Sequence, residues 1–208
     1  MKYHELALVI AILSAGSVLV PGNSLANAVD DNQLHHHHHH AMAGNGYTRS
    51  VASYRTPDVK LTDADGREVS LHDSLEGKEP VMLNFIFTTC STICPVMSAS
   101  FSQAQEKFVP ERGKVRMVSI SIDPEHDTPA RLKEYSKKFG AGPQWSMLTG
   151  SIENSIAVQR AFNVYRGDKM NHEPVTFIHM GAGQPWVRID GFISADDLLS
   201  EYRKFASN

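Results

Sequence analysis

The sequence predicts an α/β fold in which helices cover both faces of a central mixed β-sheet. Apolar runs rich in β-forming residues alternate along the chain with segments in which apolar residues recur every three or four positions. Near the end, two strand-like runs follow each other across a short glycine-containing turn. Alternating strands and helices indicate parallel pairing, while the late strand pair indicates antiparallel pairing, so we expect a mixed sheet.

Residues 1–28 have the pattern of a secretory signal. Lys2 precedes an apolar run at 6–20, and the small residues Ala26 and Ala28 fit a cleavage site. A retained membrane anchor is the alternative, but the run is shorter than the roughly 20 residues that a spanning helix needs. We therefore expect an exported, periplasmic protein from which the signal is cleaved.

The hexahistidine run His35–His40 is a purification tag, so residues 29–46 are assigned to tag and linker and 47–208 to one domain. The only charged side chains before Gly44 are Lys2, Glu5, Asp30 and Asp31. With 20 basic and 23 acidic side chains in the whole chain, the remaining part is close to neutral. This balance gives no sign of a nucleic-acid partner.

The domain is expected to begin with a small N-terminal hairpin extension. A turn at 63–66 separates Val59–Leu61 from Glu68–Ser70, and Asp-Ala-Asp-Gly is a strong hairpin signal. A short helical turn at 71–75 follows. The apolar run Val81–Phe87 then predicts a buried strand.

The second half alternates in the same way. Lys114–Ile122 and Trp145–Leu148 are the next expected strands, and Val175–Met180 and Trp186–Asp190 form the late pair. Helices are expected after Thr128, Ser151 and Ser194, since each of these residues is a natural N-cap; Pro129 at the first helical position and Gly140 at the end delimit the first of them.

Cys90 and Cys94 are the only cysteines, and they lie where the strand Val81–Phe87 gives way to an amphipathic helix. The helix is indicated by the apolar spacing of Met97, Phe101, Ala104 and Phe108. Residues four apart share one helical face, so both sulfurs can meet one metal ion or each other. A helix N-terminus favours the thiolate, the form that binds soft metals and attacks disulfides. The alternative is two buried packing residues.

Three segments, FIFTTCSTICPVMS, SIDPEHDTPARL and NHEPVTFI, resemble the Sco/SenC family over the chain from about Tyr54 onward. The resemblance implies a thioredoxin-like fold and a role in copper delivery for cytochrome c oxidase assembly. It implies that Cys90, Cys94 and His172 bind one copper ion, as Cu(I) or Cu(II), and that Asp123 fixes a loop or supports a ligand. An acidic residue that simply ends a strand is the alternative for Asp123.

The chain departs from the family pattern at two places. Ser91 follows the first cysteine where proline is commonest, and Asn171 precedes His172 where the family has aspartate. In a thioredoxin-like sheet the loop before Val175 lies beside the cysteine helix, which favours His172 as the ligand. We expect His72 to be a surface residue, His179 to lie on a strand face, and His126 to be a loop residue or an auxiliary ligand; Met97 is expected to pack in the core.

The residues and the resemblance together give two candidate functions. The first, which the resemblance implies, is a copper chaperone that receives copper from a donor protein and delivers it to, and/or reduces the cysteines of, the copper A site of cytochrome c oxidase, or that serves another exported copper protein. The second is a thiol-disulfide oxidoreductase that uses the Cys90/Cys94 dithiol and does not need His172. A peroxidase of the peroxiredoxin type is disfavoured because the residues upstream of Cys90 lack the expected proline and threonine spacing.

Overall fold

The computed structural model describes residues 46–108 and 115–206, in which one sheet of 8 strands has the order β1-β8-β7-β4-β5-β6-β2-β3. The strands are β1 (Tyr47–Ala52), β2 (Lys60–Asp63), β3 (Glu68–Ser70), β4 (Val81–Ile86), β5 (Arg116–Ser121), β6 (Trp145–Thr149), β7 (Val175–His179) and β8 (Trp186–Gly191). The helices are α1 (Leu71–Leu75), α2 (Ile93–Phe108), α3 (Pro129–Lys138), α4 (Ile152–Ala161), the 3₁₀ turn η2 (Lys169–Asn171) and α5 (Ala195–Ala206). The predicted signal peptide and the tag lie outside the described residues.

The sheet is mixed, as the sequence predicts. Strand β4 lies near its centre and pairs in parallel with β5 and antiparallel with β7. Strand β6 extends the parallel part, whereas β7 and β8 form an antiparallel pair. The predicted α/β class with a central mixed sheet is therefore confirmed.

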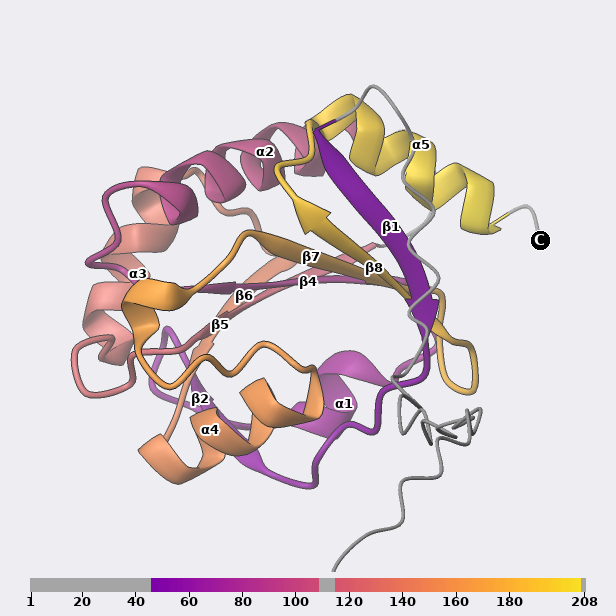
Figure 1. Cartoon of the computed structure of the whole chain (residues 1–208). Helices are drawn as coiled ribbons and strands as arrows, with labels where there is room; N and C mark the ends of the chain where they lie inside the picture. The colour runs from indigo at the N-terminus through magenta and orange to yellow at the C-terminus, as the bar shows by residue number, and fades with distance from the viewer. Residues whose placement is uncertain (1–45, 109–114, 207–208) are drawn as a thin grey trace, which may run out of the picture. The chain divides into compact units, whose positions relative to one another are not determined.

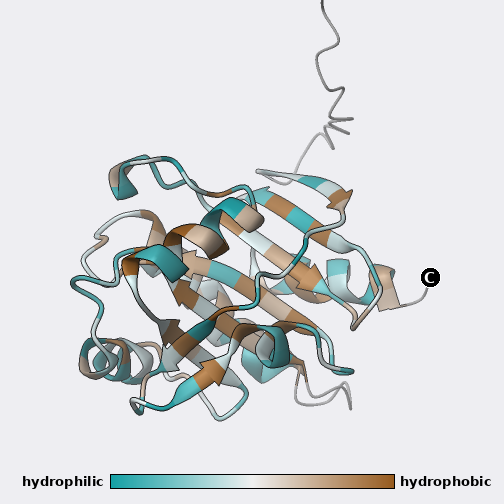
Figure 2. Cartoon of the chain, turned by 90° about the horizontal axis from the view of Figure 1, so that it is seen from below, coloured by the Kyte–Doolittle hydropathy of each residue, from teal (hydrophilic) through white to brown (hydrophobic). Residues whose placement is uncertain are grey.

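Helices cover both faces of this sheet (Figure 1). Helices α2, α3 and α5 share one apolar core with Met82 and Ile86, and α1 and α4 share the other with Leu83 and Phe85. Successive residues of a strand point to opposite faces, so β4 supplies both cores and is buried along its whole length. In Figure 2 the brown, hydrophobic colour is concentrated on the strands, while the helices show alternating teal and brown.

The helices begin at the predicted caps. Thr128 accepts a hydrogen bond from the backbone N–H of Arg131, and Ser151 accepts one from Asn154. Each such bond satisfies a backbone donor that the first helical turn leaves free. The caps fix where α3 and α4 start, and therefore where the loops beside the candidate site end.

Two expectations about the N-terminal part need correction. The predicted hairpin exists as β2 and β3, but β2 also pairs with β6, so the hairpin is an integral edge of the main sheet and not an extension. The sequence does not predict strand β1, which pairs with β8 along its full length. It is an edge strand whose middle residues Thr48, Arg49 and Ser50 are polar and only partly buried, so its sequence lacks the apolar signal of a central strand.

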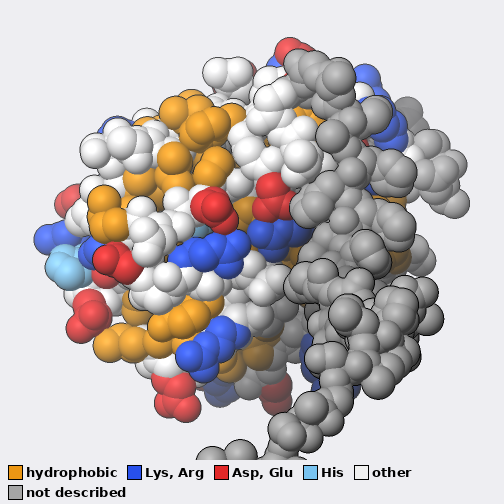
Figure 3. Space-filling view, in the orientation of Figure 1, with side chains coloured by type: hydrophobic (Ala, Val, Ile, Leu, Met, Phe, Trp, Pro, Cys, Tyr) orange, Lys and Arg blue, Asp and Glu red, His pale blue; other side chains and the backbone are white. Residues whose placement is uncertain are grey.

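The surface carries charges of both signs. On the face shown in Figure 3, basic and acidic side chains of the described residues lie side by side without a continuous basic patch. Within the described ranges, no helix combines the length and the apolar character that crossing a membrane requires.

Candidate metal centre

The end of strand β4 places the first cysteine at the mouth of helix α2. Phe87, which follows β4, is buried, and its carbonyl accepts the backbone N–H of Cys90 at 3.1 Å. This turn reverses the chain, and α2 begins at Ile93, three residues after Cys90. The predicted placement of both cysteines at a strand-to-helix turn is therefore what the structure shows.

The two cysteines lie in contact but in different surroundings. Cys94 is fully buried in the first turn of α2, whereas Cys90 is half-buried, and both are free thiols. The backbone N–H of Cys94 donates to Sγ of Cys90 at 3.5 Å, and Oγ1 of Thr92 lies 3.7 Å from the same sulfur. The sulfur of Cys90 thus occupies the position where a helix N-terminus stabilises negative charge.

These surroundings separate the acidities of the two thiols. Partial burial disfavours the Cys90 thiolate, but hydrogen bonds from the backbone of Cys94 and Thr92 and from the Cys94 thiol outweigh it, so the pKa of Cys90 is lowered. Burial raises the pKa of Cys94 far above its ordinary value, and the neighbouring Cys90 and Asp127 add to this. Cys90 is therefore the more readily ionised thiol of the pair, and the Cys94 thiol donates a hydrogen bond to it.

We expect iodoacetamide to alkylate Cys90 well before Cys94. Because the pKa of Cys90 is lowered, more of Cys90 than of a free cysteine stays in the thiolate form as pH falls through about 8.5, the pKa of a free cysteine. The alkylation of Cys90 should therefore remain fast at these pH values. Peptide mass spectrometry of samples quenched over a pH series measures both rates. Equal rates at the two cysteines, or faster reaction of Cys94, would contradict this asymmetry.

His172 follows η2 and is buried beside the end of β4. Its Nε2 lies 3.0 Å from the backbone carbonyl of Phe85, which only accepts hydrogen bonds, so Nε2 carries the proton and Nδ1 keeps a free lone pair. Burial lowers the pKa of His172, although the bond to Phe85 opposes this. The neutral imidazole is the form that binds metals.

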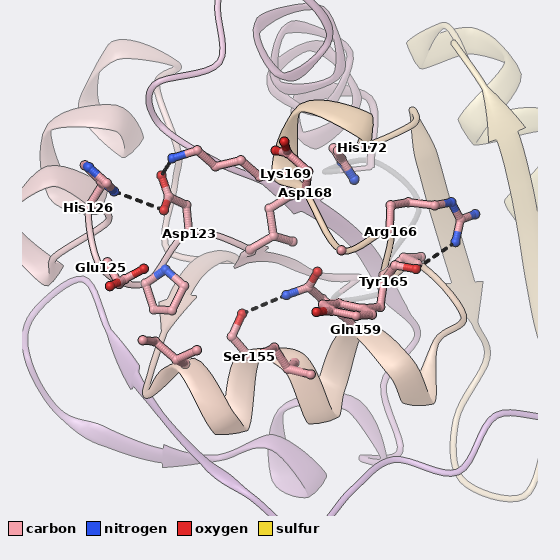
Figure 4. Close-up of a pocket in the computed structure, with 16 residues that line it drawn as sticks. Asp123, Glu125, His126, Ser155, Gln159, Tyr165, Arg166, Asp168, Lys169 and His172 are labelled. Carbon is pink, nitrogen blue, oxygen red and sulfur yellow. Dashed lines mark hydrogen bonds and ion pairs between the residues drawn. The ribbon is translucent and has the colours of Figure 1, made fainter.

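The structure does not join all three predicted ligands into one site. Across the described ranges, no three His, Cys, Asp or Glu side chains are grouped closely enough to hold a metal ion. Cys90 and Cys94 are in contact, while His172 lines a pocket of about 490 Å³ between α4, the loop after β5 and the segment before β7 (Figure 4). The three-ligand set stays a prediction.

The remaining histidines and Met97 are placed as follows. His72 is exposed on α1, and Met97 packs in the core, as expected. His179 lies on β7 and is buried, with its ring stacked on Trp186 at 4.3 Å between centroids. His126 lies in the loop after β5, and its Nδ1 is 3.1 Å from a carboxylate oxygen of Asp123.

Asp127 is a site residue that the sequence pattern does not single out. Its buried carboxylate accepts hydrogen bonds from the backbone N–H of Thr88 at 3.1 Å, from the Thr88 hydroxyl at 2.5 Å, and from the Ser121 hydroxyl at 2.6 Å. Asp127 therefore ties the turn before Cys90 to the end of β5. Its position in the segment Asp-Pro-Glu-His-Asp-Thr-Pro is visible in the sequence, but the partner Thr88 is not.

Asp123 has the loop-fixing position that the resemblance implies. Its carboxylate is almost completely buried, with one oxygen near His126 and the other 2.5 Å from Nζ of Lys169. Lys169 is the first residue of η2, so this ion pair joins the end of β5 to the turn that precedes His172. Asp123 is thus more than an acidic residue that ends a strand.

The comparison with protein families assigns the chain. A family model described as SCO1/SenC matches residues 49–207. The chain belongs to the SCO1/SenC family. This match includes both cysteines, the Asp-Pro segment and His172, so it covers every residue of the candidate site.

Relatives of known structure and sequence agree with this assignment. A SCO1 protein homolog from Bacillus subtilis is 36% identical over 114 residues, which cover 54% of this chain and 58% of that protein. The structure of Arabidopsis thaliana ScoI with copper bound is 29% identical with a TM-score of 0.60, covering 72% of this chain and 96% of that one. A SCO1/SenC family lipoprotein from Bacillus anthracis has the same fold at 23% identity and a TM-score of 0.64, covering 76% and 98%.

The comparisons also show how much of each relative the chain spans and how far its fold agrees with solved Sco proteins. The chain spans about half the length of the first curated relatives that it matches, between 51% and 58% of each. The sheet flanked by helices matches the thioredoxin-like fold of solved Sco proteins, so that part of the predicted fold class is confirmed as well.

Proposed function

We propose that this protein is an exported copper chaperone that binds one copper ion through Cys90, Cys94 and His172 and delivers it to the copper A site of cytochrome c oxidase. The observation that supports this most is the contact between the half-buried Cys90 sulfur and the N-terminus of α2, with Cys94 beside it. Membership in the SCO1/SenC family, in which the Arabidopsis thaliana relative was crystallised with copper, supports the choice of metal.

The donor set fits copper as cargo. Two thiolates favour Cu(I), and one imidazole in addition makes Cu(II) acceptable, so the same residues can hold either oxidation state. Three protein ligands leave coordination positions open, and through these an acceptor protein can take the ion. The lowered pKa of Cys90 favours this chemistry because metal binding requires the thiolate.

His172 is prepared for a ligand role by its hydrogen bond to strand β4. Metal-binding histidines usually donate their second ring N–H to a carbonyl or carboxylate, which fixes the ring and its tautomer. The bond from Nε2 to the Phe85 carbonyl at 3.0 Å has this form and leaves Nδ1 as the atom that would bind copper. The backbone carbonyl of Phe85 therefore supplies the support that an aspartate before the histidine cannot give here, since Asn171 stands in its place.

The test is copper binding by the reduced protein after removal of the tag, because His35–His40 bind Cu(II) by themselves. Wild type should bind one copper ion and show a thiolate-to-Cu(II) charge-transfer band. His172→Ala should lose this band and bind Cu(II) about 100-fold more weakly or worse, since removing even an outer-shell partner costs roughly 10–100-fold. His72→Ala, which changes an exposed histidine, is the matched control and should behave as wild type.

Thiol-disulfide exchange is the second candidate function, and the unequal acidities of the two thiols favour it. The Cys90 thiolate would attack a partner's disulfide and release one partner thiol. Cys94 would then displace the partner, which leaves a Cys90–Cys94 disulfide and a second partner thiol, a transfer of two electrons in all. If tag-free protein binds no copper tightly but reduces disulfides readily, in wild type and His172→Ala alike, this function replaces copper delivery.

A further inference from the structure

Lys169 lies where three segments of the site meet. It is the first residue of η2, its Nζ is 2.5 Å from Oδ2 of Asp123 after β5, and the same Nζ lies over the ring of Phe87 after β4, 5.8 Å from the centroid. Figure 4 shows the lysine side chain reaching across the rim of the pocket to Asp123. One side chain thus contacts the ends of two central strands.

The partner of Lys169 is itself fixed. The Asp123 carboxylate is 7% exposed, and its other oxygen faces His126. The backbone of Asp123 donates to the Ser121 hydroxyl and accepts from the N–H groups of His126 and Asp127. Because these bonds hold Asp123 at the end of β5, the ion pair connects η2 to a rigid point of the sheet.

Among the described residues, the other bonds from this region to the sheet come from His172 itself, to the Phe85 carbonyl of β4, and from the Pro174 carbonyl, which accepts the N–H of Gly191 in β8. No side chain of η2 is buried, and Met170 is 72% exposed. The ion pair between Arg166 and Glu173 joins two ends of the same segment and does not attach it to the sheet. Among the described residues that precede His172 in this turn, Lys169 is therefore the one that links the turn to the ends of β4 and β5.

Lys169 and His172 are joined by the hydrogen bonds that close η2. The backbone N–H of His172 donates to the Lys169 carbonyl at 3.1 Å. Asp168 accepts the N–H of Met170 through its side chain at 2.9 Å and the N–H of Asn171 through its carbonyl at 3.0 Å. We therefore expect a change in the position of Lys169 to alter the position of His172.

We propose that Lys169 is a positioning residue for copper: its ion pair with Asp123 and its contact with Phe87 hold the turn that carries His172 against the ends of β5 and β4, and from this turn His172 would reach a copper ion bound by the cysteines. This role rests on the proposed function and adds to it a residue outside the ligand set. It predicts that removing the Lys169 charge weakens binding that depends on His172, and leaves binding by the two thiolates alone nearly unchanged.

The test compares Lys169→Met with Lys169→Arg. Methionine keeps an unbranched side chain over Phe87 but loses the ion pair, so Cu(II) affinity should fall about 10-fold and the charge-transfer band should shift, while Cu(I) affinity changes little. Arginine restores the pair with Asp123 and should recover wild-type binding. Lys107→Met removes the exposed ion pair with Asp196 and is the matched control, with no expected change.

Two further measurements separate positioning from general damage. In a His172→Ala background, Lys169→Met should cause no additional loss of Cu(II) affinity. Amide hydrogen exchange at residues 169–172 should be faster in Lys169→Met than in wild type, with the rest of the sheet unchanged. Unchanged Cu(II) binding, a loss that persists without His172, or unchanged exchange would each overturn the proposal. Failure of wild type to bind copper would refute the proposed function and this copper role together, although faster exchange would still identify Lys169 as the anchor of the turn.

Discussion

Cys90→Ser and Cys94→Ser should each abolish tight copper binding. A serine hydroxyl is neither deprotonated at neutral pH nor a soft donor, so each change removes one of the two groups that favour Cu(I). The loss should exceed the roughly 100-fold upper end of outer-shell changes, because a ligand itself is removed. Competition with a Cu(I) chelator, together with titration of Cu(II) followed by visible absorption, measures both oxidation states in the tag-free protein.

The two cysteine variants also distinguish the functions. Serine is close to cysteine in size, so both variants should fold, and Cys90→Ser changes a half-buried position with little strain. Cys90→Ser should eliminate attack on disulfides completely, whereas Cys94→Ser should still form a stable mixed disulfide through Cys90. Tight copper binding that survives either substitution would refute the assignment of this pair as ligands.

The fold could be predicted from the sequence where a strand is buried on both faces or where a helix begins at a recognisable cap. Strand β4 is buried on both faces, so its run of apolar residues is readable, and the caps Thr128 and Ser151 mark α3 and α4 through a local rule. Strand β1 could not be predicted in this way. It is an edge strand with Arg49 and Ser50 at partly buried positions, so its sequence has neither an apolar run nor a clear alternation of apolar and polar residues. The 3₁₀ turn η2 is too short to leave a periodic pattern.

Some contacts of the candidate site could be predicted from sequence spacing, whereas others depend on the arrangement of the strands. Cys90 and Cys94 are four residues apart, so one helical turn is enough to bring them together, and their contact follows from sequence spacing. Asp127 and Lys169 act on partners 39 and 46 positions away, so their roles depend on how strands are arranged in the sheet. The resemblance to a family implied the ligand His172, but it did not specify the Phe85 carbonyl that holds the ring.

Asp127→Ala should cause a large loss of stability. The change removes the acceptor of three hydrogen bonds and leaves the N–H and hydroxyl of Thr88 and the hydroxyl of Ser121 without this buried partner. Hydrogen bonds to a charged group are worth about 1.5–3 kcal/mol each, and part of this is offset because the buried carboxylate no longer has to be desolvated. We expect a decrease of about 3 kcal/mol in the free energy of unfolding, measured by denaturation in urea.

The same bonds hold the turn before Cys90, so Asp127 should also affect copper binding if the cysteines are its ligands. Asp127→Asn keeps one acceptor oxygen for Thr88, so it should cost only about 1–2 kcal/mol and retain more copper affinity than alanine. Asp196→Ala, at an exposed position paired with Lys107, is the control and should cost less than about 1 kcal/mol. If Asp127→Ala were as stable as this control, the carboxylate would not hold the turn before Cys90, and the cysteine pair would owe its geometry to α2 alone.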